Sequence, residues 1–378
     1  LPESLYLHGI YMSDTENDPL LECITTLMPI LLNTMQAFDQ VQRALHPPRF
    51  QKLAEFLQPY SRQLTEANRQ LQQVQFPAHV ESFHHQLQEA TTHALRACEN
   101  FAANSGGQGG LGQVMRAMRC HCRAQESIYP LAPIMTPVSE YFLEMPFRKN
   151  KELIASLAQE NGNGGIMHAD NDRESRGGFS LYVPEHADAN TPLALVVALH
   201  GGAGHGADFL WSWLREARGR GFILIAPTSQ EGTWSLMGSD YDSKPIRSML
   251  DYVQDNWSVD TQHVLLTGLS DGATFALLSG LQQNSPFTHL APLSGVLHPE
   301  NFINGNMTRV NGKPIYLVHG SLDWMFPIES AYMARDELTK AGAELVFREI
   351  KDLSHNYARG ENDAILSWFN PLLSLPHG

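Results

Sequence analysis

The chain has 378 residues, a formal net charge of −14 and an isoelectric point near 5.6, and 43% of its residues are hydrophobic. This length predicts two domains or one large one, with enough apolar residues for a sizeable core. The acidic balance argues against nucleic acid and anionic membrane surfaces as partners. No apolar run is long enough to predict a membrane span.

Neither the first residues nor the cysteines indicate secretion. Residues 1–8 have no basic start and no long apolar stretch, so no secretory signal is predicted there. Cys23, Cys98, Cys120 and Cys122 lack the spacings of zinc and redox motifs. We therefore expect buried, reduced thiols and a cytoplasmic protein.

Residues 1–160 are predicted to form a helical bundle domain. From Leu21 onward, apolar residues recur at alternating steps of three and four in three successive segments that reach Phe101. A fourth segment follows the glycine-rich turn at 105–110. Four such helices with short connections predict an antiparallel bundle. Pro29 and Pro59 fall inside the pattern and are expected to kink or split their helices.

The stretch between the two expected domains is predicted to be mostly a linker. Residues 130–150 are proline-rich, 151–160 predict one more helix and 161–165 form a glycine-rich linker. The segment His168–Glu174 carries one histidine and three acids, but their spacing matches no known ligand pattern. It therefore predicts a solvated interdomain loop, and no metal or cofactor is expected.

Residues 161–378 alternate predicted strands and helices. The strands are expected at 179–183, 193–199, 222–226, 263–267, 289–293, 314–318 and 344–350. The helices are expected to run through 209–217 and at 246–257, 273–280, 330–341 and 363–369. This alternation predicts an α/β domain with a parallel sheet covered on both faces. Ligands then bind at the carboxyl ends of the strands.

The pentapeptide Gly268-Leu-Ser-Asp-Gly272 lies between a predicted strand and a predicted helix. G-x-S-x-G in that position is typical of a nucleophile elbow, in which the serine is held in a strained, exposed turn. The turn is too tight for side chains at its two ends, so glycine is expected at both. Ser270 is therefore the candidate nucleophile.

A nucleophilic serine needs a base, and the base needs an orienting carboxylate. Asp323 directly follows one predicted strand, and His355 lies in the loop after the last one. The chain order Ser270, Asp323, His355 is that of an α/β-hydrolase triad. Asp352 and Asp363 are rival acids, but neither follows the right strand.

A tetrahedral intermediate carries an oxyanion that needs two N–H donors. One is expected from the backbone of Asp271, and the other from the loop His200-Gly-Gly-Ala-Gly204, where we favour Gly202 with Ala203 as the alternative. His200 itself is expected to have a structural role. Phosphate binding by this loop is disfavoured because neither G-x-G-x-x-G nor G-K-[ST] is present.

Three side chains beyond strand ends are candidates for contact with the substrate. They are Trp234, Trp324 and Met325. Each could equally well pack within the protein without touching the substrate.

From about Phe179 to the end, the chain resembles the α/β-hydrolase superfamily. The similarity is carried by Leu181–Pro184, Val197–Gly202, Val259-Asp260 with Val264–Gly272, and His319–Asp323. The groups it resembles are the phospholipase/carboxylesterase and the polyhydroxybutyrate-depolymerase/feruloyl-esterase families. The resemblance implies an α/β-hydrolase domain at 161–378 that cleaves carboxylic esters without a metal. The helical domain at 1–160 departs from these families.

The sequence as a whole predicts a serine esterase that acts on a small-molecule ester through an acyl-enzyme. A peptidase or thioesterase with the same three residues is the alternative within enzymes. A hydrolase-fold scaffold without activity is the alternative from another class. The helical domain is expected either to cap the pocket or to join two copies of the chain.

Overall fold

A computed structural model describes residues 19–103, 110–158, 164–187 and 190–375. The chain divides into two compact units, Leu1–Gln159 and Glu160–Gly378, called here the helical unit and the sheet unit. The expectations for residues 1–8, for most of the turn at 105–110 and for most of the linker at 161–165 lie outside the described residues.

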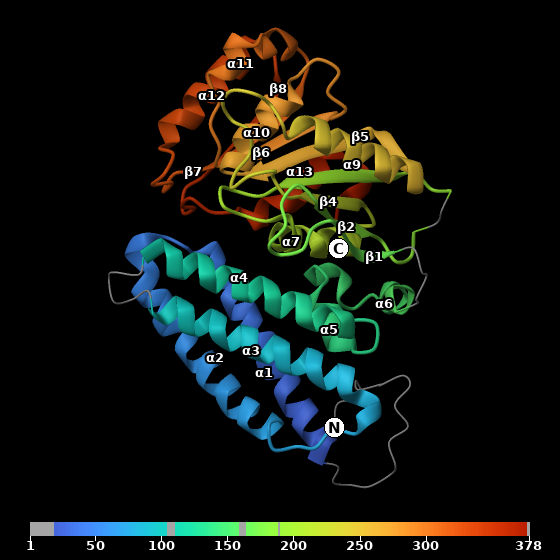
Figure 1. The fold of residues 1–378 in the computed structure, drawn as a ribbon. Helices are drawn as coiled ribbons and strands as arrows, with labels where there is room; N and C mark the ends of the chain where they lie inside the picture. Colours follow the sequence, from blue (N-terminus) through green and yellow to red (C-terminus); the bar gives the residue numbers. More distant parts are fainter. Residues whose placement is uncertain (1–18, 104–109, 159–163, 188–189, 376–378) are drawn as a thin grey trace. The chain divides into compact units, whose positions relative to one another are not determined.

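In the part of the helical unit that the structure describes, four long helices pack side by side (Figure 1). Their apolar faces are buried. The helices are α1 (Pro19–Arg43), α2 (Phe50–Leu71), α3 (Glu81–Ala103) and α4 (Gly110–Ile128), followed by the short α5 (Thr136–Tyr141) and α6 (Lys151–Leu157). Phe38 and Phe101 meet edge to face in its core, with ring centroids 6.1 Å apart. The proline-rich stretch therefore contains a short helix, α5, as well as connecting turns.

Pro29 and Pro59 lie inside α1 and α2, and both helices continue through them, so of the two expected effects splitting does not occur. Burial of the apolar faces along each whole helix offsets the one hydrogen bond that a proline removes. In addition, α1 is long and apolar enough to cross a membrane by length and composition, although no such segment was expected. Half of its apolar window is buried inside the protein.

The described residues of the sheet unit form one sheet of eight strands in the order β1-β2-β4-β3-β5-β6-β7-β8 (Figure 1). They are β1 (Gly165–Ala169), β2 (Phe179–Val183), β3 (Leu193–Leu199), β4 (Ile223–Pro227), β5 (Val259–Leu269), β6 (His289–Leu293), β7 (Pro314–Gly320) and β8 (Glu344–Ile350). β1 pairs antiparallel with β2, and β2 antiparallel with β4. All other pairs are parallel, so the carboxyl ends of β3 to β8 share one edge of the sheet.

The helices of the sheet unit cover both faces of this sheet. They are α7 (Gly206–Phe209), α8 (Leu214–Arg220), α9 (Ser243–Asn256), α10 (Asp271–Gly280), α11 (Glu300–Ile303), α12 (Ile328–Lys340) and α13 (Asn362–Phe369). Every residue of β4 is buried, although successive side chains point to opposite faces. Continuous burial of this kind requires cover on both sides, as the apolar runs predicted.

Two details of the sheet unit differ from expectation. The helix expected through residues 209–217 is three short pieces, α7, a 3₁₀ turn at Leu210–Ser212 and α8. Strand β1 was not predicted, and it makes the segment His168–Glu174 the end of β1 and the start of a hairpin loop rather than an interdomain loop. An edge strand of only five residues, Gly-Ile-Met-His-Ala, carries too little alternation to be recognised.

Candidate active site

Ser270 lies between the end of β5 and the start of α10. Its backbone has φ 58° and ψ −119°, a strained conformation for a residue with a side chain. A Cβ on Gly268 would lie 2.6 Å from the carbonyl carbon of Gly272, and a Cβ on Gly272 would lie 2.4 Å from the carbonyl oxygen of His200. The turn therefore has room only for glycine at these two positions, which is the geometry of a nucleophile elbow.

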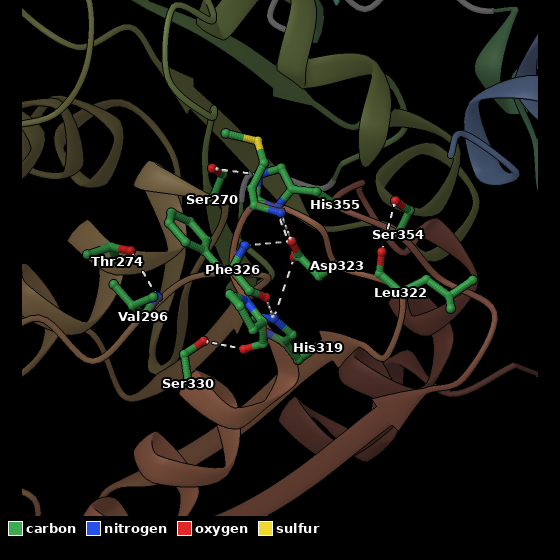
Figure 2. Close-up of polar contacts among 12 residues, drawn as sticks. Ser270, Thr274, Val296, His319, Leu322, Asp323, Phe326, Ser330, Ser354 and His355 are labelled. Carbon is green, nitrogen blue, oxygen red and sulfur yellow. Dashed lines mark hydrogen bonds and ion pairs between the residues drawn. The ribbon is translucent and has the colours of Figure 1, made fainter. Parts of the chain in front are cut away.

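Three side chains from separate loops form one chain of hydrogen bonds (Figure 2). The Nε2 atom of His355, in the loop after β8, lies 2.9 Å from the Ser270 Oγ. The Nδ1 atom of His355 lies 2.8 Å from the Oδ2 of Asp323, in the loop after β7. Because an ionised carboxylate only accepts, Nδ1 carries the proton and Nε2 is left to accept one from the serine hydroxyl. This arrangement can activate Ser270 as a nucleophile.

The loop that carries Asp323 encloses its carboxylate. The backbone N–H groups of Met325 and Phe326 donate to Oδ1 at 3.0 and 2.8 Å, which leaves Oδ2 for His355. Beneath this loop, the fully buried His319 on β7 bonds through Nε2 to the Phe326 carbonyl at 2.8 Å and lies 3.5 Å from Asp323 Oδ2 (Figure 2). The carboxylate is thus fixed from three sides.

The rival acids lie elsewhere in the sheet unit. Asp363, in the first turn of α13, forms an ion pair with Arg220 at 2.9 Å. Asp352 lies exposed in the turn after β8, three residues before His355. The structure places Asp323 in hydrogen-bond contact with His355, whereas Asp363 pairs with Arg220.

Two backbone hydrogen bonds hold the loop after β3. Gly204 N–H donates to the Gly201 carbonyl at 3.0 Å, and Ala203 N–H donates to the Gly232 carbonyl at 2.8 Å. The Ala203 N–H therefore already has an acceptor, so of the two predicted donors from this loop Gly202 is the better one. Asp271 is the first residue of α10, where a backbone N–H has no acceptor within the helix.

The His200 side chain links this loop to the segment after β4 through two hydrogen bonds. Ser229 N–H donates to its Nε2 at 3.1 Å, so Nδ1 carries the proton and donates to the Gly201 carbonyl at 2.7 Å. Burial lowers the pKa of His200 to about 3, which keeps the ring neutral and this pattern intact near neutral pH.

The three candidate substrate contacts separate into two kinds. Trp234 is buried in the core, stacks on Phe275 and donates from Nε1 to the His200 carbonyl at 2.7 Å, so its ring packs inside the protein rather than lining an open surface. Trp324 and Met325 are 47% and 45% exposed, directly after Asp323. Proximity of a loop to a strand end does not reveal which way its side chains turn.

Other residues around the site were not singled out from the sequence. Thr233 donates from Oγ1 to the Asp271 carboxylate at 2.6 Å, and Arg176 reaches the loops after β3 and β4 from the β1–β2 hairpin. No motif marks either residue. His168 bonds to Ser180 Oγ, and within the described ranges no group of three or more histidines, cysteines or acids could hold a metal ion.

The strand order, the antiparallel hairpin at one edge and the elbow after β5 together define the sheet unit as an α/β-hydrolase fold, as the sequence predicted. Residues 238–370 match the family of phospholipases and carboxylesterases. The chain is therefore similar to carboxylesterase-type hydrolases in its C-terminal half.

Two curated proteins are 30% identical to parts of this chain. One is the bifunctional acetylxylan esterase/xylanase XynS20E of Neocallimastix patriciarum, matched over 148 residues that cover 38% of this chain and 21% of that protein. The other is poly(3-hydroxyalkanoate) depolymerase C of Paucimonas lemoignei, matched over 126 residues that cover 30% of each. The chain thus matches less than a third of the length of either relative.

Solved structures with a similar arrangement include the fluorophosphonate-binding serine hydrolase F of Staphylococcus aureus, at 16% identity and a TM-score of 0.46, over 57% of this chain and 100% of that one. An acetyl xylan esterase from Aspergillus awamori is 17% identical with a TM-score of 0.42, over 55% of this chain and 99% of that one.

Proposed function

We propose that the sheet unit is a serine carboxylic-ester hydrolase that acts on small-molecule esters. The observation that carries this proposal is the hydrogen-bond chain from Ser270 through His355 to Asp323, with distances of 2.9 and 2.8 Å. The similarity of residues 238–370 to phospholipases and carboxylesterases supports the same chemistry.

In the proposed reaction, Ser270 Oγ attacks the ester carbonyl while His355 Nε2 takes its proton. Asp323 orients the ring and stabilises the imidazolium. The N–H groups of Gly202 and Asp271 donate to the oxyanion. His355 then returns the proton to the leaving alcohol, and water hydrolyses the acyl-enzyme by the same steps in reverse order.

Labelling with a fluorophosphonate tests this proposal directly. The reagent should modify Ser270 of the full chain, as located by mass spectrometry of peptides, and Ser270→Ala should not be labelled. A panel of p-nitrophenyl esters of graded length, with a matched thioester and a p-nitroanilide, then separates esterase from thioesterase and peptidase activity. A folded wild-type protein that is neither labelled nor active on any of these substrates would contradict the proposal.

A further inference from the structure

Arg176 lies in the hairpin loop between β1 and β2 and ties together two other loops of the sheet unit. Its Nη1 donates to the Gly204 carbonyl at 2.7 Å, and its Nε donates to the Ser229 carbonyl at 3.1 Å. Its Nη2 donates to the Ser229 hydroxyl and to the Glu231 carbonyl. The guanidinium is thus hydrogen-bonded to backbone carbonyls and one hydroxyl in two segments that are far apart in the sequence.

These two segments are the ones that hold the proposed oxyanion donor. Gly204 closes the turn that contains Gly202 through its hydrogen bond to Gly201. The segment after β4 accepts the Ala203 N–H at Gly232 and donates the Ser229 N–H to His200. Arg176 therefore links the turn 201–204, which contains Gly202, to the segment 229–232, which supports that turn. We infer that this link fixes the Gly202 N–H relative to Ser270.

The rest of the hairpin loop holds Arg176 in place. Thr228 N–H donates to the Gly178 carbonyl at 2.8 Å, and His205 bonds through Nε2 to the Ser175 carbonyl at 3.1 Å. A Cβ on Gly178 would lie 2.1 Å from the Asp170 carbonyl oxygen, so the chain can return to β2 at this point only through glycine. The arginine is therefore presented from a loop that is itself anchored on both sides.

We propose that Arg176 is a positioning residue for the oxyanion site, and this inference rests on the proposed function. A planar guanidinium with five N–H groups can span these four acceptors, whereas the three N–H groups of a lysine ammonium all lie on one nitrogen atom. Since oxyanion donors act mainly in the transition state, disturbing their frame lowers kcat and leaves KM nearly unchanged.

The test compares Arg176→Ala, Arg176→Lys and Arg173→Ala in the full chain. Arg173 belongs to the same hairpin loop and forms an ion pair with Asp208 on α7, so its variant controls for general loosening of the loop. We expect a fall of ~10–100-fold in kcat for both Arg176 variants at constant KM. Affinity for an alkyl boronic acid, which mimics the tetrahedral state, should fall in parallel. Added guanidinium should restore part of the activity of Arg176→Ala.

The outcomes are distinct. Wild-type kcat in both Arg176 variants, or a rise in KM alone, would overturn the inference, as would an equal loss in boronic acid affinity for Arg173→Ala. If Arg176→Ala does not fold, Ser229→Ala removes one of the four contacts and should lower kcat several-fold at constant KM; an unchanged kcat there would also overturn it. If the wild type is labelled at Ser270 while the Arg176 variants remain fully active, only this inference fails.

Discussion

Ser270 and His355 are predicted to act as one unit. The hydroxyl and the Nε2 atom that accepts its proton are 2.9 Å apart, so removing either partner abolishes the same step. We expect Ser270→Ala and His355→Ala each to lower kcat by ~10⁴-fold or more, and the double variant to be scarcely worse. Steady-state kinetics on an activated ester, with circular dichroism to verify folding, measures this. Ester turnover by folded Ser270→Ala would contradict the assignment of the nucleophile.

Asp323 is predicted to be the acid of the same unit. Asp323→Asn should lower kcat by up to ~10⁴-fold, because an amide that donates to His355 stabilises the wrong tautomer. Asp352→Ala and Asp363→Ala provide the matched comparison and should retain activity. The opposite pattern, with a fully active Asp323→Ala, would place the acid elsewhere.

His319 supports Asp323 without reaching the serine. Its Nε2–H donates to the Phe326 carbonyl and so holds the turn whose N–H groups bind Oδ1. We expect His319→Leu to lower kcat ~10–100-fold through misplacement of Asp323. His319→Gln, which can place a donor near the Nε2 position, should lose less. Equal kcat values for the two variants would show that this hydrogen bond does not matter for activity.

Among elements, the glycine-rich loop after β3 should be sensitive to both lost donors and added volume. Gly202→Pro removes the proposed donor and should lower kcat by ~10²–10³-fold with a much smaller change in KM. Gly202→Ala keeps the N–H, but its methyl group would lie 2.6 Å from Asp271 Oδ2. Deleting that carboxylate in Gly202→Ala/Asp271→Ala should therefore restore part of the activity lost in Gly202→Ala.

Kinetics of these variants distinguish the two effects. A folded Gly202→Pro protein with wild-type kcat would move the oxyanion donor to another residue. If Gly202→Ala loses the same factor with and without Asp271→Ala, the crowding explanation is wrong.

At the scale of the whole molecule, the buried His200 and the partly buried His289 should make folding sensitive to acid. Burial lowers the pKa of His200 to about 3, and burial together with nearby positive charge lowers the pKa of His289 to about 4. Both values lie below the ~6.5 of an unfolded chain, so the unfolded state binds more protons between these limits. The stability that the two neutral histidines give to the folded state is complete above pH 6.5. The contribution of His289 is lost as the pH falls to about 4, and that of His200 as it falls to about 3.

Urea unfolding at pH 7, 6 and 5 checks this prediction. Each such histidine adds up to ~1.4 kcal/mol per pH unit to the slope of the free energy of unfolding against pH. The contribution of the partly exposed His289 is smaller because solvent screens it. His289→Gln should therefore make the free energy of unfolding less dependent on pH. His79→Gln, at an exposed position of the helical unit, is the control and should change nothing. If the free energy of unfolding of His289→Gln depended on pH as strongly as that of the wild type, His289 would not contribute to the acid sensitivity.

The two units are expected to unfold separately, because each has its own buried core. Calorimetry should resolve two transitions, and covalent modification of Ser270 by a phosphonate should raise the melting temperature of only one. Unmodifiable Ser270→Ala is the control. A single transition with equal calorimetric and van 't Hoff enthalpies would show that the whole chain unfolds as one cooperative unit.

Local sequence pattern was enough to predict the long helices, most of the strands and the position of the elbow, but not β1 or α5. Apolar steps of three and four identify α1 to α4, and continuous apolar runs identify buried strands such as β3, because a side chain's burial follows directly from the period of its element. The elbow at Ser270 was recognisable because its two glycines meet a steric demand within five residues of chain.

Only the tertiary structure decided contacts between segments that are distant in the sequence. It brought Asp323 and not Asp363 to His355, directed the Ala203 N–H to Gly232, and placed Trp234 in the core while leaving Trp324 exposed. It also revealed Arg176, whose partners lie 28 to 55 residues away. Such choices depend on which loops meet at the sheet edge and on how each side chain turns there, and neither is encoded in a local period.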